Sequence, residues 1–243
     1  MTRSTERPVR VAAIGDLHIG ETGEPDYRPL FAEISERADI LVLCGDLTNY
    51  GKTSEAEALA DQLRSATIPT VAVLGNHDHD CGQPEVVARY IGEAGVRVLD
   101  GEAIEIGGIG FAGCMGAMGG FGRGMLSSFG EGYVKEFVHR AAEENLKLEN
   151  SLRMLRTPRA MAVLHYAPVP DTLVGEPCEI LPFLGNSRLA EVIDRYDNVR
   201  AVVHGHAHRG VFRGQTPRGV PVYNCARMVA NAETGRPYAM IEL

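Results

Sequence analysis

The sequence of 243 residues predicts an α/β fold in which strands alternate with helices. Two observations predict it. Short apolar runs end at a glycine or a histidine and lead into polar loops, and amphipathic segments with helical periodicity lie between the first of these runs. In folds of this class the loops that follow the strands gather at one edge of a sheet, where ligands bind. We therefore expect a functional site at that edge.

Five apolar runs are the predicted strands, and they cover residues 9–14, 39–44, 70–74, 160–164 and 201–203. Runs of this length without alternating polar residues are typical of strands that are buried on both faces. The residues that directly follow them are Gly15, Gly45, Gly75, His165 and His204. Each predicted strand therefore delivers a polar loop at its carboxyl end.

Three segments are predicted helices. Ser54 and Glu57 have the spacing of a capping box at the start of the first helix. Pro84 suits the first turn of a second helix, over residues 84–94. The segment 134–155 has apolar residues at helical spacing, which favours a long helix packed on the core, with a dimer helix as the alternative.

Glycines and short Val- and Ile-rich runs change the pattern elsewhere. Residues 96–112 and the stretch from Val211 onward are typical of antiparallel hairpins. The Gly-rich segment 107–124 is interpreted as a surface loop, with a mobile loop near a site as the alternative. Neither an internal repeat nor a low-complexity linker marks a boundary, so we expect one domain over residues 1–243.

Composition limits the classes of partner and compartment. Lys and Arg total 24 against 32 Asp and Glu, for a net charge of -8, and the basic residues are scattered, which disfavours a nucleic-acid partner. Five cysteines without a CxxC pair predict neither a disulfide framework nor a thiolate zinc site. Residues 1–10 are polar, and no apolar run is long enough to span a membrane. We expect a cytoplasmic protein without membrane contact, and the sequence leaves the oligomeric state open.

Candidate ligands follow the first two predicted strands. Asp16 and His18 lie two residues apart after the first strand, where both side chains can turn to one side and bind a single ion. Asp46 follows the second strand, and its two carboxylate oxygens can bridge two metal ions. Alone, an Asp-x-His pair is more often a surface pair and Gly-Asp is a common turn.

The sequence Gly-Asn-His-Asp after the third strand is more specific. Asn76 offers a neutral oxygen ligand, and His77 can donate or accept a proton. Asp78 is expected to fix the tautomer of the His77 ring.

Imidazoles follow the last two predicted strands. His165 ends an apolar strand, where a core histidine bonded to backbone is the alternative interpretation. His206 and His208 stand at alternate positions after a glycine. Nitrogen and oxygen ligands without thiolate suit Mn or Fe, and also Zn, Ni or Co, better than a structural zinc site.

The ordered series Asp-x-His, Gly-Asp, Gly-Asn-His-Asp, His and Gly-His-x-His resembles the five blocks of the calcineurin-like metallophosphoesterases, from Asp16 to His208. This resemblance implies a four-layer α/β/β/α sandwich of two mixed sheets with flanking helices. It also implies two divalent metal ions bridged by Asp46, and a phosphoester hydrolase activity.

The resemblance implies a role for each candidate residue. One ion would be held by Asp16, His18, Asp46 and His208, and the other by Asp46, Asn76, His165 and His206. His77 would stabilise or protonate the leaving oxygen, with Asp78 behind it.

Departures from the family patterns narrow the expected substrate. Protein phosphatases of this family carry Gly-Asp-x-x-Asp-Arg-Gly, whereas this chain has Asn49 and Tyr50 where the Asp-Arg pair would stand. Lipid A pathway pyrophosphatases usually have Arg at the position of His77. We therefore expect a phosphodiesterase on a small or nucleotide-like phosphoester. A nuclease of the same superfamily and a catalytically silent protein-binding scaffold are the alternatives.

Overall fold

The computed structural model describes residues 7–243, so the predictions for residues 1–6 lie outside the described part of the chain. The strands are β1 (Arg10–Ile14), β2 (Ile40–Cys44), β3 (Thr70–Val73), β4 (Val96–Val98), β5 (Ala103–Ile106), β6 (Ile109–Gly113), β7 (Ala160–Val163), β8 (Val199–His204), β9 (Arg213–Gln215), β10 (Pro221–Asn224) and β11 (Ala239–Glu242). The α-helices are α1 (Arg28–Arg37), α2 (Thr53–Leu63), α3 (Pro84–Glu93), α4 (Gly132–Met154), α5 (Leu181–Leu184), α6 (Ser187–Ile193) and α7 (Arg227–Thr234).

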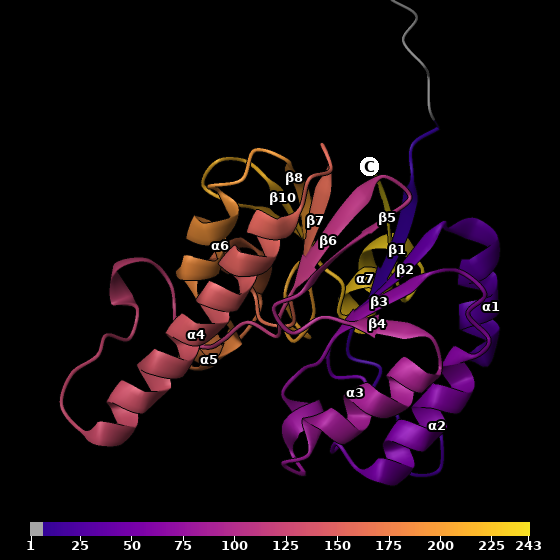
Figure 1. The fold of residues 1–243 in the computed structure, drawn as a ribbon. Coiled ribbons are helices and arrows are strands. Elements are labelled where there is room, and N and C mark those ends of the chain that lie inside the picture. Colours follow the sequence, from indigo (N-terminus) through magenta and orange to yellow (C-terminus); the bar gives the residue numbers. More distant parts are fainter. Residues whose placement is uncertain (1–6) are drawn as a thin grey trace, which may run out of the picture.

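Two mixed sheets form the centre of the molecule. The first has the strand order β11-β1-β2-β3-β4, in which β11 is antiparallel to β1 and the remaining pairs are parallel. The second has the order β5-β6-β7-β8-β10-β9, with antiparallel pairs at both edges and parallel pairs between them. Helices α1, α2 and α3 lie beside the first sheet, and α4 and α6 beside the second (Figure 1).

Three hydrophobic clusters join these layers. One cluster lies between the sheets and combines Val42 and Val73 of the first sheet with Phe111 and Val163 of the second. A second cluster packs the other face of the first sheet on α1, α2 and α3, and a third packs the second sheet on α4 and α6. Because the central strands are covered on both faces, their sequences are continuously apolar. The expected α/β/β/α sandwich is confirmed.

The segment 96–112 differs from the prediction of antiparallel hairpins. β4 pairs in parallel with β3 and closes the first sheet, whereas β5 and β6 form the expected antiparallel hairpin in the second. From Val211 onward, β9 and β10 are antiparallel, but β10 is parallel to β8 and β11 crosses to the first sheet. Local patterns do not encode which distant strand becomes the neighbour.

The predicted capping box of α2 is also wrong. The helix begins at Thr53, and the carboxylate of Glu55, rather than Glu57, accepts hydrogen bonds from the backbone N–H groups of Lys52 (3.2 Å) and Tyr50 (2.8 Å). Glu57 instead accepts a hydrogen bond from the Tyr90 hydroxyl on α3 (2.8 Å).

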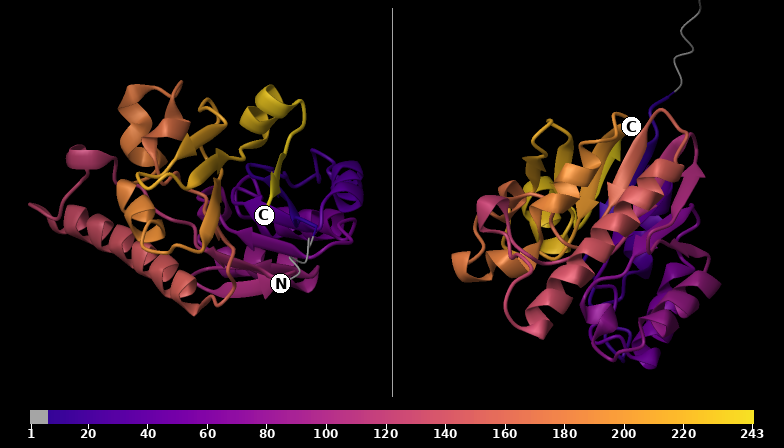
Figure 2. Two further views of the ribbon diagram at one scale, coloured as in Figure 1. Left: turned by 90° about the horizontal axis from the view of Figure 1, so that it is seen from above. Right: turned by 60° about the vertical axis from the view of Figure 1, so that its left-hand side comes forward.

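Helix α4 follows the Gly-rich segment and is the longest helix described. Its carboxyl-terminal half packs on the second sheet through Leu148 and Leu152, as the favoured interpretation of this segment required. Its first turns project past the sheet, as both views of Figure 2 show. Among residues 7–243, no helix is long and apolar enough to cross a membrane.

Candidate metal centre

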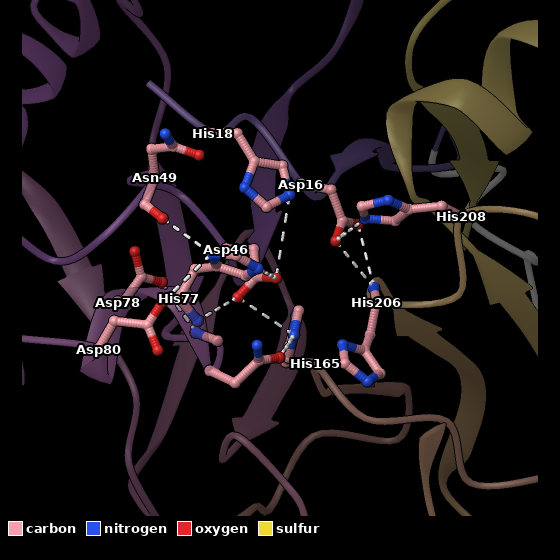
Figure 3. Close-up of polar contacts among 12 residues, drawn as sticks. Asp16, His18, Asp46, Asn49, His77, Asp78, Asp80, His165, His206 and His208 are labelled. Atoms are coloured by element: carbon pink, nitrogen blue, oxygen red, sulfur yellow. Dashed lines mark hydrogen bonds and ion pairs between the residues drawn. The ribbon is translucent and has the colours of Figure 1, made fainter. Parts of the chain in front are cut away.

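The seven predicted metal ligands come together where parallel strands of the two sheets end (Figure 3). They follow five strands: Asp16 and His18 follow β1, Asp46 follows β2, Asn76 follows β3, His165 follows β7, and His206 and His208 follow β8. Residues as far apart in sequence as Asp16 and His208 are thus neighbours.

Two separate clusters of ligand atoms can be distinguished, and a third set, His18, Asp46 and His77, overlaps both of them. The outer group consists of Asp16, His18 and His208, and the Nε2 of His208 lies 2.9 Å from the Oδ1 of Asp16. The inner group consists of Asp46, His165 and His206. Within each group, one ligand atom from every residue lies within 4.8 Å of the others.

Asn76 joins the inner group, and Asp46 connects the two groups. The Nε2 of His165 lies 2.9 Å from the Oδ1 of Asn76 and 3.3 Å from the Oδ1 of Asp46. The second oxygen of Asp46, Oδ2, lies 4.0 Å from the Nε2 of His18 in the outer group. One carboxylate therefore presents one oxygen to each group.

The backbone at four of the candidate ligands is left-handed. Asp16, His18, Asp46 and His206 have φ values of 60°, 50°, 50° and 69°. Such values are uncommon for residues with a Cβ and cluster at functional sites, where the surrounding structure imposes them. Here the backbone N–H of Asp16 donates to Gly45 O (2.9 Å), and that of His206 donates to the Asp16 carboxylate (3.0 and 3.1 Å).

Two glycines allow the ligand loops to approach one another. A Cβ on Gly75 would overlap the Oδ1 of Asp46, and a Cβ on Gly45 would lie 2.5 Å from the Nδ1 of His165. Gly45 also has a φ of +82°. The glycine before each ligand loop, which the sequence shows after three strands, thus lets the inner group form.

In the inner group, the hydrogen bonds of His165 and His206 to backbone carbonyls leave one ring nitrogen of each as an acceptor. The Nδ1 of His165 donates to the carbonyl of Cys44 (2.9 Å), so its Nε2 carries a lone pair toward the oxygens of Asn76 and Asp46. His206 likewise donates from Nε2 to the carbonyl of Phe183 (3.2 Å), which leaves its Nδ1 free to bind an ion. Converging acceptors of this kind fit a cation.

The outer group contains a further indication of a cation. The Nε2 of His18 is buried and has no hydrogen-bond partner among residues 7–243. A buried polar atom without a partner costs free energy, and such exceptions are explained by a role in ligand binding or by an ion. The donor set of both groups therefore fits divalent metal ions.

Burial keeps two of the imidazoles neutral. It lowers the pKa of His206 to about 3 and that of His18 to about 4, so both rings can bind metal without losing a proton at pH 7. Burial acts to raise the pKa of Asp16, but its hydrogen bond with His208 and the nearby imidazoles lower it overall. The same hydrogen bond raises the pKa of His208.

His77 lies beside Asp46, and its Nε2 is 4.0 Å from the Oδ2 of that carboxylate. Its Nδ1 bonds to the carbonyl of Asn49 (2.8 Å) and lies 3.5 Å from Asp80 (Figure 3). His77 also lies close to His18, with the ring centroids 4.7 Å apart.

The expected contact of Asp78 with the His77 ring is wrong. The buried carboxylate of Asp78 accepts hydrogen bonds from the backbone N–H groups of Leu47, Thr48 and Gly75 and from the Thr48 hydroxyl. Burial raises the pKa of Asp78. Asp78 therefore ties the loop after β2 to the loop after β3, and the carbonyl of Asn49 orients the ring instead.

The sequence alone did not indicate three neighbours of the site: Asn49, Asp80 and Arg227. The Nε of Arg227, at the start of α7, donates to the carbonyl of Asp16 (2.9 Å) and so supports its left-handed backbone. No local motif marks these residues. Asn49 contributes only its backbone carbonyl, and Asp80 and Arg227 reach the site through contacts that only the fold creates. The Asp at position 80, three residues after His77, is the one signal that sequence spacing offered.

Comparison with known proteins agrees with this geometry. The family model described as calcineurin-like phosphoesterase matches residues 9–210. A "probable cyclic nucleotide phosphodiesterase" of Synechococcus sp. is 25% identical over 219 residues, which cover 84% of this chain and 75% of the relative. A "probable glycerophosphodiester phosphodiesterase" of Arcobacter nitrofigilis is 22% identical over 213 residues, covering 82% of this chain and 71% of the relative.

Solved structures have the same fold. A phosphopantetheinyl hydrolase of Mycobacterium tuberculosis aligns with a TM-score of 0.66 at 16% identity, over 97% of this chain and 96% of the other. A dimetal phosphatase from Danio rerio aligns with a TM-score of 0.64 at 14% identity, over 98% of this chain and 93% of the other.

Proposed function

Because the chain belongs to the calcineurin-like phosphoesterase family and is a metal-dependent phosphoesterase, we propose that it hydrolyses phosphodiesters at a centre of two divalent metal ions. The observation that carries this proposal is the position of Asp46, which presents one carboxylate oxygen to the inner group and the other to the outer group. Two-metal phosphoesterase sites use such shared ligands.

In this proposal every predicted ligand has a place. One ion would be held by the outer group with Asp46, which makes the set Asp16, His18, Asp46 and His208, and the other by Asp46, Asn76, His165 and His206. Nitrogen and oxygen donors without thiolate favour Mn or Fe, with Zn, Ni or Co as further candidates. When bound, such ions lower the pKa of water and stabilise charge on phosphoryl oxygens.

His77 would act on the leaving group. Its Nδ1 is held by the carbonyl of Asn49, so a proton on the opposite nitrogen, Nε2, would point toward the metal ligands and be available to a departing oxygen. The carboxylates of Asp46 and Asp80 lie 4.0 Å from its Nε2 and 3.5 Å from its Nδ1. Asp78 would serve this step only indirectly, by fixing the loop that carries His77.

The choice of a diester over a monoester rests on what lies beside Asp46. Asn49 and Tyr50 occupy the positions of the Asp-Arg pair of protein phosphatases, and Tyr50 is exposed. Several relatives are named as probable phosphodiesterases, which supports the same choice. A net charge of -8 speaks against a nuclease, and a complete set of ligands speaks against a silent scaffold.

We further propose that the chain forms one domain and works in a reducing compartment such as the cytoplasm. The cluster shared by the two sheets supports a single domain. The five cysteines are free, and Cys44, Cys114 and Cys225 are buried.

The test is a hydrolysis screen of Mn-loaded protein with an aryl phosphodiester, an aryl phosphomonoester, a cyclic nucleotide and short DNA. We expect the diester and the cyclic nucleotide to be hydrolysed faster than the monoester. A clear preference for monoesters across several leaving groups would overturn the diester assignment, and preferred cleavage of DNA would support a nuclease. Metal-loaded protein that hydrolyses none of these esters would support the scaffold.

A further inference from the structure

A pocket of about 470 Å³ lies beside the metal centre, between α4 and residues 115–118 of the Gly-rich segment. The residues of its wall that matter here are Met115, Met118, Phe137, Arg140, Glu144 and Tyr166. A volume of this size falls within the range of small-molecule sites. We call it the arm pocket.

The arm pocket borders the inner group through the side chain of Tyr166. Tyr166 directly follows the ligand His165, and its ring packs edge-on against the rings of His165 and His206, with centroid distances of 5.4 and 4.7 Å. The carbonyl of Met115 accepts hydrogen bonds from the backbone N–H groups of both His165 and Tyr166 (3.0 Å each). An organic group of a phosphoester bound at the centre would reach this pocket by extending past Tyr166.

The wall of the pocket is fixed from two sides. The backbone N–H of Gly116 donates to Glu144 of α4 (3.2 Å), and Glu144 is itself paired with Lys147 (2.7 Å). On the other side, the amide of Asn186 donates to the carbonyl of Ala117 (2.7 Å). The loop therefore does not need to fold around a ligand, and the pocket is formed in advance.

The lining combines flat or polarizable apolar groups with one unpaired cation. Two thioethers, from Met115 and Met118, and two aromatic rings, from Phe137 and Tyr166, offer the contacts that a planar ring prefers. Arg140 is exposed at the pocket and has no hydrogen-bond or ion-pair partner in the part of the chain that the structure describes. Its guanidinium can stack on a base or donate to its carbonyl oxygens.

We propose that the arm pocket binds the nucleoside arm of a phosphodiester and so selects nucleotide-like substrates over esters with small alkyl arms. This inference rests on the proposed phosphodiesterase function. In the complex, the base lies among Met115, Met118 and Phe137, and Arg140 contacts its polar edge. Tyr166 lines the pocket and packs against the proposed ligand His165.

The test uses two esters with the same leaving group: thymidine 5′-(4-nitrophenyl phosphate) and methyl 4-nitrophenyl phosphate. Release of nitrophenol by Mn-loaded protein gives kcat/KM for each, and their ratio isolates the effect of the nucleoside arm. We expect a ratio of at least about tenfold in the wild type, the discrimination that a fitted pocket provides. Ala117→Phe, which fills the pocket, should reduce the ratio to near one.

Arg140→Ala is the milder variant, since Arg140 holds no other residue, and it should lower the ratio several-fold through KM. Arg153→Ala, an exposed arginine further along α4, is the matched control and should leave the ratio unchanged. A ratio near one in the wild type, or a ratio that survives both pocket variants, would overturn the proposal. Failure of the wild type to hydrolyse either ester would instead overturn the proposed function.

A second readout does not depend on turnover. The protein is labelled with ¹³C in its methionine methyl groups and titrated with thymidine 5′-monophosphate or inorganic phosphate. Ring currents of a bound base should shift the signals of Met115 and Met118, assigned through Met→Leu variants, whereas phosphate should leave them in place. Equal responses to the two titrants would count against a base in the arm pocket.

Discussion

The inner and outer groups share Asp46 but are built in different ways. In the inner group, His165 is fully buried and each imidazole is held by a backbone carbonyl, Cys44 O or Phe183 O. In the outer group, the His208 side chain is 37% exposed and its Nε2 is engaged with the carboxylate of Asp16. The inner nitrogens are thus oriented and free, whereas an outer nitrogen must leave a partner before it binds metal.

This difference indicates that two metal ions of one centre can bind with different affinities. Preorganised ligands whose tautomer is fixed by a second hydrogen bond bind metal more tightly than ligands that must rearrange. We therefore expect the inner group to form the tighter site and the outer group the weaker and more pH-sensitive one.

The largest effect is expected from Asp46→Asn, because this residue serves both groups. Metal content should fall at both sites, and kcat/KM should drop on the order of 10³-fold or more, as when charge stabilisation at a reacting centre is lost. Metal analysis and diester hydrolysis measure the two outcomes. Asp61→Asn, at an exposed carboxylate on α2, should change neither. One fully retained ion with near-normal activity would show that the groups do not share Asp46.

His77→Ala asks whether His77 belongs to either group. We expect metal content near that of the wild type and a loss of turnover of about 10²- to 10⁴-fold, typical of a lost general acid. The loss should be smaller for a nitrophenyl ester than for an alkyl or ribose ester, since an acidic phenol departs without help. His139→Ala, at an exposed histidine of α4, is the control. Loss of metal in proportion to activity would make His77 a ligand.

Stability of the metal-free protein should respond to pH with opposite signs at His206 of the inner group and at His208 of the outer group. Burial lowers the pKa of His206 from 6.5 to about 3, so the unfolded chain binds its proton first as the pH falls below 6.5. The free energy of unfolding then decreases by up to roughly 1.4 kcal/mol per pH unit. The pKa of His208 is raised, so its contribution is complete below pH 6.5 and is lost as the pH rises.

Denaturant unfolding of the metal-free protein between pH 7.5 and about pH 4.5 distinguishes these contributions. His206→Ala should flatten the loss of stability on acidification, and His208→Ala should make it steeper. Equal slopes in the two variants and the wild type would show that neither ring has the environment described.

The smallest effect is a difference in affinity between the two sites. Titration of metal-free protein with Mn²⁺ should show two steps separated by about tenfold or more, equivalent to about 1.4 kcal/mol. His165→Ala should remove the tighter step and His208→Ala the weaker one. A single step in the wild type, or the reverse assignment in the variants, would contradict the comparison.

The sequence predicted that the residues of both groups lie together because each follows a buried strand whose apolar run can be read directly. Asp16, Asp46 and His165 are examples, since parallel strands must bring their carboxyl ends to one edge. The α/β alternation followed from the same runs. The four layers came from the resemblance to a family, because apolar periodicity does not say how many sheets share a core.

Other features could not be predicted because they depend on contacts between residues that are far apart in the sequence. The short run of β4 was assigned to a hairpin, but its parallel partner β3 lies across helix α3 in the sequence. Asp78 was expected to face the neighbouring ring, whereas four donors from two loops hold its carboxylate. The start of α2 was misplaced because Ser54 and Glu57 match a local pattern that Glu55 satisfies in the structure.

The left-handed backbone of Asp16, His18, Asp46 and His206 has a consequence for laboratory evolution. At each of these positions glycine would relieve a conformational cost of order 1 kcal/mol or more, and asparagine would relieve part of it. Variants selected for thermal tolerance alone should therefore accumulate glycine at the very positions that we propose as metal ligands. Such a selection would raise thermal stability at the expense of metal binding and activity. Efforts to stabilise this protein should therefore keep these four positions unchanged and substitute other residues.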